Sequence, residues 1–136
     1  MASRNPVTVT GNLAADPERF TTAGGRSGVR GTVVENIGYK PRNGGEYVET
    51  DPVFWPFTVW DEGLAENVAA SLSKGARVTV TGRYTNNVWT GDDGVKRSRL
   101  ELTADEVAAS LRFATATLVR QGRSIDAPPP LDEPPF

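Results

Sequence analysis

The chain has 136 residues, 38% of them hydrophobic, which is enough for one domain with its own core. No segment approaches the ~20 apolar residues of a membrane helix, and no hydrophobic block precedes the first strand-like segment, so neither membrane insertion nor secretion is expected. The absence of cysteine and histidine excludes disulfides and thiolate metal sites and removes the usual general base and thiol nucleophile. A cytoplasmic binding protein without catalysis, metal or other cofactor is the simplest class.

The formal net charge of −2 hides an uneven distribution of charge. From residue 126 onward the chain carries Asp126, Asp132 and Glu133 but no Lys or Arg. The rest of the chain holds 14 of the 17 acidic residues against all 15 basic ones and is therefore about neutral. The overall sign says little about partners, and the local placement of charge matters more.

The first part of the chain has the pattern of successive strands and turns. Residues 6–13 are rich in β-branched side chains and predict a strand, which is followed by an Asp-Pro turn at residues 16–17 and a glycine turn at residues 22–25. Residues 29–39 predict a long strand. Residues 38–45 predict a flexible, basic loop, whose Asn-Gly-Gly sequence favours a hairpin.

Residues 52–60 predict a further strand with two different faces. One face is wholly apolar and consists of Val53, Trp55, Phe57 and Val59. The other face is mixed and carries two aromatic residues, Phe54 and Trp60. Because side chains alternate across a strand, these two rings are expected to lie opposite the apolar stripe.

A change of period from two to about 3.6 marks one helix, residues 61–74. Apolar residues recur there at i, i+4 and i+8, namely Leu64, Val68 and Leu72. Asp61 can cap the N-terminus of this helix, and Gly75 can end it.

The region after the helix predicts a strand at residues 77–84 and a hairpin with its turn at residues 91–94 and its second strand at residues 96–103. In total, four or five antiparallel strands are expected, with a helix between the third and the fourth. This order suits the all-β class and an OB-fold, a five-stranded Greek-key barrel with a helix at one end. Other small α+β domains would also fit, so periodicity alone does not select the barrel.

The C-terminal part of the chain has two different patterns. Residues 108–119 are mixed, because their alanines favour a helix whereas the alternation from Phe113 to Val119 favours a strand; a strand is the preferred interpretation. Residues 120–136 are polar and rich in proline, which predicts a short disordered acidic tail. The folded domain is therefore expected to span residues 1–119.

Motifs in order along the chain resemble the bacterial-type single-stranded-DNA-binding protein family, or SSB family. They are Val-Thr-Gly-Asn-Leu-Ala-Ala-Asp-Pro-Glu at residues 9–18, Gly24-Gly25, Leu-Ala-Glu-Asn-Val-Ala at residues 64–69, Lys-Gly-Ala-Arg-Val-Thr-Val-Thr-Gly-Arg at residues 74–83, Trp89 and the terminal Asp-Glu-Pro-Pro-Phe. Residues 106–116 are similar to an extension of actinobacterial members, in which it is a strand that clamps subunits together. An actinobacterium or one of its phages is therefore the expected source.

The resemblance implies an OB-fold, homotetramers built from dimers, and sequence-independent binding of single-stranded DNA (ssDNA) in replication, recombination and repair. It also implies recruitment of the proteins of these processes by the tip of the tail, Asp132, Glu133, Pro134, Pro135 and Phe136. An aromatic ring beside carboxylates suits a partner pocket with an apolar floor and a basic rim. The alternative is an OB-fold adaptor whose main role is protein recruitment, with weak DNA binding.

Binding of ssDNA without sequence preference needs aromatic rings for base stacking and cations along the phosphates. The resemblance implies that the stacking residues are Tyr39, Phe54, Trp60 and Trp89. Strand parity supports Phe54 and Trp60 independently. Trp55 lies on the apolar stripe and is assigned to the core or to a subunit interface.

Cationic residues occur in two groups beside these rings. The group around Tyr39 consists of Arg26, Arg30, Lys40 and Arg42, and the group around Trp89 consists of Arg83, Lys96, Arg97 and Arg99. Residues 84–88 carry no Lys or Arg, whereas many family members have several there, so a lower affinity or a larger share of stacking is expected. Asp92 and Asp93 could be the paired acids of an enzyme, but they lie in a glycine-bounded turn, where Asp is expected for backbone reasons.

Overall fold

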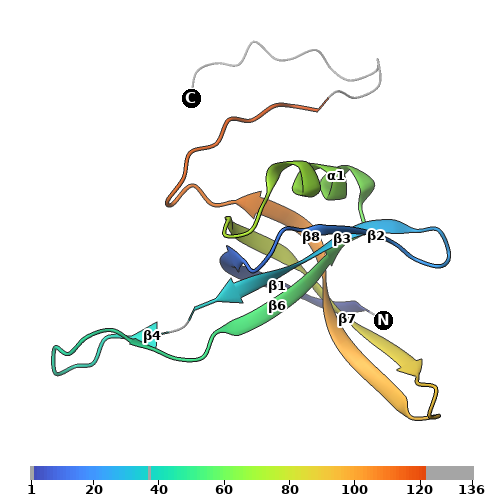
Figure 1. Ribbon diagram of the computed structural model, residues 1–136, viewed down its shortest axis with the longest axis horizontal. Helices are drawn as coiled ribbons and strands as arrows, with labels where there is room; N and C mark the ends of the chain where they lie inside the picture. The colour runs from blue at the N-terminus through green and yellow to red at the C-terminus, as the bar shows by residue number, and fades with distance from the viewer. Residues whose placement is uncertain (1, 37, 122–136) are drawn as a thin grey trace.

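The computed structural model describes residues 2–36 and 38–121, and a five-stranded barrel forms its centre (Figure 1). The barrel strands are β1 (Ala2–Leu13), β3 (Ser27–Glu35), β6 (Val53–Val59), β7 (Arg77–Thr90) and β8 (Lys96–Ala109). They are hydrogen-bonded in the order β1-β7-β8-β6-β3, and β1 returns to β3 at Asn12 and Leu13, which closes the barrel. The expected Greek-key OB-fold is confirmed, although β6 and β8 run parallel and not antiparallel as expected.

Alternate residues of the barrel strands fill its interior. The buried positions are Val9, Leu13, Val29, Val33, Phe57, Val59, Val78, Val80, Leu102 and Ala104. Valine dominates this set because β-branched side chains pack well on a pleated surface. Gly11 lies where β1 approaches β3, and a Cβ on Gly11 would overlap the carbonyl oxygen of Val34. The barrel therefore closes around a residue without a side chain.

Helix α1 (Glu62–Ser71) follows β6 and covers one end of the barrel (Figure 1). The Asp61 carboxylate accepts a hydrogen bond from the Leu64 N–H at 2.8 Å, which is the N-cap that the sequence predicts. Ala65 and Val68 are buried against the barrel core. No helix in the described part of the chain is long and apolar enough to cross a membrane.

The end of α1 differs from the expectation. The helix ends at Ser71, because Leu72 adopts an extended conformation and packs against the core. Gly75 lies instead in the turn that follows, with a φ of 90°, and its N–H donates to the Leu13 carbonyl at 2.9 Å. The turn between α1 and β7 is therefore hydrogen-bonded to the end of β1.

Three short strands lie outside the barrel. β2 (Glu18–Thr21), for which the sequence shows no strand pattern, forms a hairpin with β3. β4 (Gly38–Tyr39) and β5 (Val48–Glu49) form a separate hairpin that projects away from the barrel (Figure 1). The long strand expected over residues 29–39 is interrupted after Glu35, because the partner strand β6 begins at Val53, directly opposite Glu35.

Beyond the barrel, β7 and β8 continue as a two-stranded arm formed by residues 85–100 (Figure 1). The sequence predicts strands only to Tyr84 and Thr103, but the two strands pair along almost their whole lengths, to Thr90 and Ala109. Gly94, with a φ of 78°, lies in the turn at the tip of the arm. Mutual pairing therefore extends both strands past the limits that their composition indicates.

The chain after β8 only partly fits the strand expected over residues 108–119. Ala108 and Ala109 end β8, and the Ser110 N–H donates to the Arg77 carbonyl at 2.9 Å. Among the described residues, 111–121 have no strand partner, because β7 begins at Arg77 and offers nothing further to pair with. The predicted acidic tail lies outside the described residues from position 122 onward.

Candidate nucleic-acid interface

The two faces of β6 differ as its alternation predicts. Phe57 and Val59 are buried, whereas Phe54, on the opposite side, is 59% exposed. Trp60 directly follows the strand, shares the side of Phe54 and is half-buried. The register with β3 and β2 extends this side into an outer face composed of Glu18, Phe20, Arg30, Thr32, Phe54, Pro56, Thr58 and Trp60.

Trp55 has the environment of a structural residue. It is half-buried and packs against the core. Its indole N–H donates to a Glu35 carboxylate oxygen at 3.2 Å, and its ring lies 6.4 Å from that of Tyr84. Desolvation by burial raises the pKa of the Tyr84 phenol. This placement agrees with the assignment of Trp55 to the core or to an interface.

An aromatic pair covered by an arginine lies at one end of the outer face. The rings of Phe20 and Trp60 meet edge-on with centroids 5.1 Å apart, and the Arg26 guanidinium lies 4.1 Å from the Trp60 ring centroid. Gly28 leaves room for Phe20, because a Cβ there would lie 3.0 Å from the phenyl ring. Phe20 is not predicted from the sequence, because β2 is too short to show alternation. The hairpin register, which places Phe20 opposite Gly28, is the signal that identifies it.

The arm carries a ring and several arginines on one side. Cross-strand partners point to the same side of a sheet, and Trp89, which is 42% exposed, pairs with Arg97. The side chains that point to the same side of the arm as Trp89 form the arm face, which consists of Arg83, Thr85, Asn87, Trp89, Arg97, Arg99 and Glu101. Lys96 pairs with Thr90 and lies on the other side. The structure therefore separates Lys96 from the cations expected around Trp89.

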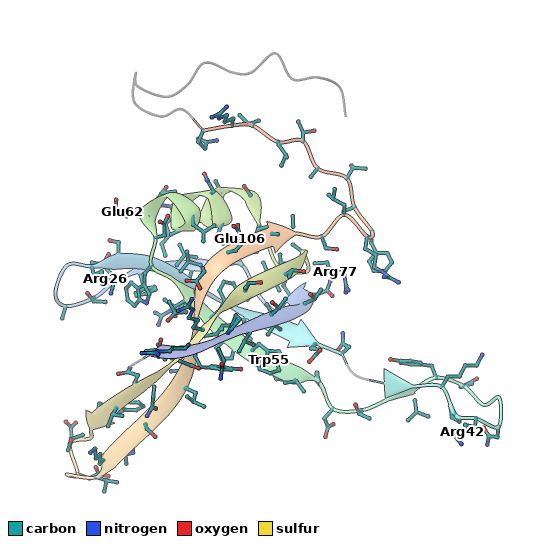
Figure 2. The ribbon with its side chains drawn as sticks, turned by 180° about the vertical axis from the view of Figure 1, so that it is seen from behind. Arg26, Arg42, Trp55, Glu62, Arg77 and Glu106 are labelled. Atoms are coloured by element: carbon teal, nitrogen blue, oxygen red, sulfur yellow. The ribbon has the colours of Figure 1, made fainter. Side chains whose placement is uncertain are left out.

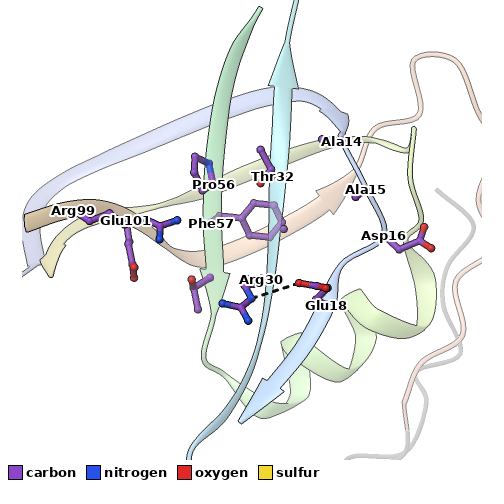
Figure 3. Close-up of a pocket in the computed structure, with 12 residues that line it drawn as sticks. Ala14, Ala15, Asp16, Glu18, Arg30, Thr32, Pro56, Phe57, Arg99 and Glu101 are labelled. Carbon is purple, nitrogen blue, oxygen red and sulfur yellow. Dashed lines mark ion pairs between the residues drawn. The ribbon is translucent and has the colours of Figure 1, made fainter. Parts of the chain in front are cut away.

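A groove of about 270 Å³ lies between the arm face and the outer face (Figure 3). Arg99 and Glu101 line it from β8, and Arg30, Pro56 and Thr58 line it from the outer face. The two surfaces therefore meet along one concavity, although their residues are far apart in the sequence.

Three arginines of these surfaces are paired with carboxylates of the same chain. The pairs and their N–O distances are Arg30–Glu18 at 3.7 Å, Arg83–Asp105 at 3.9 Å and Arg97–Asp93 at 2.8 Å. Hydrogen bonds from the Val95 N–H and from Arg97 lower the pKa of Asp93. Within the described part of the chain, Arg99 forms no ion pair, and no group of acidic residues could hold a metal ion.

The structure does not bring all of the expected site residues together. Lys40 and Arg42 are exposed on the hairpin of β4 and β5, and Arg42 lies near its far end (Figure 2). Tyr39 belongs to β4, but its side chain lies outside the described part of the structure. The tip of the tail, residues 132–136, also lies outside the described residues.

Comparison with known sequences gives one consistent result. A model of the "Single-strand binding protein family" matches residues 4–110. A "Single-stranded DNA-binding protein" of Mycobacterium leprae is 40% identical over 124 residues, which cover 91% of this chain and 73% of that protein. The protein of the same name from Paenarthrobacter aurescens is 38% identical over 124 residues, with coverages of 91% and 72%.

Solved structures show the same fold. One, described as "Plasmodium falciparum SSB complex with ssDNA", superposes with a TM-score of 0.65 at 19% identity and covers 79% of this chain and 96% of its own. A small single-stranded DNA-binding protein from Streptomyces coelicolor superposes with a TM-score of 0.60 at 23% identity, with coverages of 79% and 94%. At these identities the likeness concerns the fold alone.

Proposed function

Because the chain belongs to the single-strand binding protein family, we propose that it binds ssDNA without regard to sequence and without catalysis, in replication, recombination and repair. The observation that carries this proposal is the groove along which the outer face and the arm face meet, with arginines on both sides. Exposed rings stack bases at ~1–3 kcal/mol each, and guanidinium groups pair with phosphates. The proposed contacts are Phe54, Trp60, Trp89, Arg30, Arg83, Arg97 and Arg99, with Phe20 and Arg26 beside Trp60.

The remaining predicted residues lie beyond the groove. Tyr39, Lys40 and Arg42 belong to the hairpin of β4 and β5, and Lys96 lies on the other side of the arm. We assign them to a strand of DNA that continues past the groove. Each phosphate that they contact would steepen the dependence of log affinity on log salt by about 0.7.

A titration with fluorescently labelled oligo(dT) at several salt concentrations tests the proposal. We expect binding that weakens as salt rises, and loss of binding when Phe54, Trp60 and Trp89 are all replaced by alanine in a folded protein. No binding at moderate salt would favour the adaptor, in which protein recruitment is the main role. The absence of Lys and Arg from residues 84–88 is the observation that supports this second candidate.

We also propose that the chain assembles as a homotetramer built from dimers. Among the described residues, β1 pairs with β3 only at Asn12 and Leu13, so most of its second edge is open to a strand of another copy. The segment that follows β8, residues 110–121, carries four highly exposed apolar side chains, Leu111, Phe113, Leu118 and Val119. We assign residues 108–119 to a clamp on a neighbouring subunit. Light scattering tests this assignment, because removal of residues 110–136 should reduce the number of subunits per particle.

The tip of the tail is the proposed docking site for replication, recombination and repair proteins. The support for this proposal is that the sequence from Asp132 to Phe136 resembles the acidic tip of family members and places an aromatic ring beside carboxylates. The stretch from residue 120 to the end would have an r.m.s. reach of about 20–25 Å as a flexible chain. A docked partner would therefore stay close to the DNA.

A further inference from the structure

The groove carries more carboxylates than cations. The charged residues that line it are Arg30, Arg99, Asp16, Glu18 and Glu101. Asp16 has a structural role, because its carboxylate accepts a hydrogen bond from the Lys74 backbone N–H at 2.7 Å. Glu18 is 75% exposed and pairs only with Arg30, and Glu101 forms no ion pair or side-chain hydrogen bond, within the described part of the chain. Neither carboxylate therefore accepts a hydrogen bond from the backbone as Asp16 does.

We infer that Glu18 and Glu101 limit the affinity of the groove for ssDNA and thereby promote its release, an inference that rests on the proposed function. A phosphate that approaches Arg30 competes with the Glu18 carboxylate, which already lies 3.7 Å from the guanidinium and faces it in the groove (Figure 3). Glu101 lies two residues from Arg99 on the arm face and repels a phosphate held there. An exposed ion pair contributes little to folding, so its exchange for a phosphate is easy but yields little net attraction.

The arm repeats this arrangement. Arg97 is paired with Asp93, and Arg83 is paired with Asp105, so each arginine has a counter-charge before DNA arrives. Arg99 is the arm-face arginine that lacks an ion pair in the described part of the chain. Such a surface offers few net positive charges to a polyanion, so most of the attraction comes from stacking. It should therefore release the polyanion readily.

The test compares oligo(dT) binding by the full-length protein with binding by Glu18→Gln, Glu101→Gln and the double variant. One unit charge a few ångströms from a phosphate in water changes affinity about five-fold, so each substitution should tighten binding by about that factor at low salt. The gain should shrink as salt rises, because the interaction is screened. Stopped-flow measurement should place most of the change in the dissociation rate.

Glu106→Gln is the matched control. It makes the same charge change on β8, but Glu106 lies five residues beyond Glu101, near the end of the strand below α1 (Figure 2), and does not line the groove. Its oligo(dT) affinity should equal that of the unmodified protein. A second check is Glu18→Gln in an Arg30→Ala background, where the gain should become smaller because the competition for Arg30 is gone.

The outcomes separate this inference from the function on which it rests. If the unmodified protein binds oligo(dT) but neither groove variant binds more tightly, the carboxylates do not limit affinity and only the inference is overturned. Equal tightening by Glu106→Gln would overturn it as well, because net charge would then be the cause. If neither the unmodified protein nor any variant binds at low salt, the proposed function itself fails.

Discussion

Phe54 and Phe57 lie three residues apart on β6 and point to opposite sides, which makes their alanine variants a matched pair. Phe57 is 2% exposed in the barrel core, whereas Phe54 is 59% exposed on the outer face. Replacing Phe57 should cost ~3–5 kcal/mol of unfolding free energy, a large part of the ~5–15 kcal/mol of a typical domain. Replacing Phe54 should cost little stability, because its ring is not part of the core.

The effect on binding should have the reverse order. Loss of one stacking platform removes ~1–3 kcal/mol, so Phe54→Ala should bind oligo(dT) about 5- to 150-fold more weakly. Thermal unfolding and the anisotropy of labelled oligo(dT), measured on the same samples, give both quantities. A folded Phe54→Ala protein with undiminished affinity would contradict the assignment of the outer face. A loss of stability as large as that of Phe57→Ala would contradict the outward position of Phe54.

Three further results are expected. Arg99→Ala should lower the slope of log affinity against log salt by about 0.7, because one phosphate contact is lost; an unchanged slope across a salt series would exclude Arg99 from the phosphate path. Removal of residues 131–136 should leave oligo(dT) affinity intact and abolish partner capture in a pull-down, and retained capture would place docking elsewhere. Hydrogen bonds from the Val95 N–H and from Arg97 lower the pKa of Asp93 in the folded protein. The carboxylate therefore stabilises the tip of the arm at any pH above the usual Asp pKa, and this contribution is lost as the pH falls from the usual pKa through the lowered one. The fluorescence of Trp89 should change over this pH range during an acid titration. In the Asp93→Asn variant this change should be absent.

Local patterns predict the elements that the site needs. The alternation on β6 separates Phe54 from Phe57 correctly, because burial on one side of a strand imposes a period of two. The Asp61 cap and the position of α1 between β6 and β7 also follow from short-range signals. The motif resemblance then selects the barrel from the other folds that would suit the same order of elements.

Features that depend on pairing between distant segments could not be predicted. β2 is four residues long, so Phe20 becomes recognisable as a neighbour of Trp60 only when the hairpin register and the barrel are known. Lys96 is separated from Trp89 because the arm register places it on the other side. The pairing of Arg83 with Asp105 is also a property of the folded chain and leaves no mark on composition.

Within the described part of the chain, β7 and β8 pair with no third strand between Asn86 and Leu100, and this has a mechanical consequence. A lone ribbon of two strands is only marginally stable in water and bends more easily than a closed barrel. Trp89 and Arg97 therefore lie on a flexible two-stranded ribbon, whereas Phe54 and Arg30 lie on strands of the rigid barrel. Nucleotides laid across both would restrict the bending of the ribbon, and the entropy lost in this way offsets part of the stacking energy gained at Trp89.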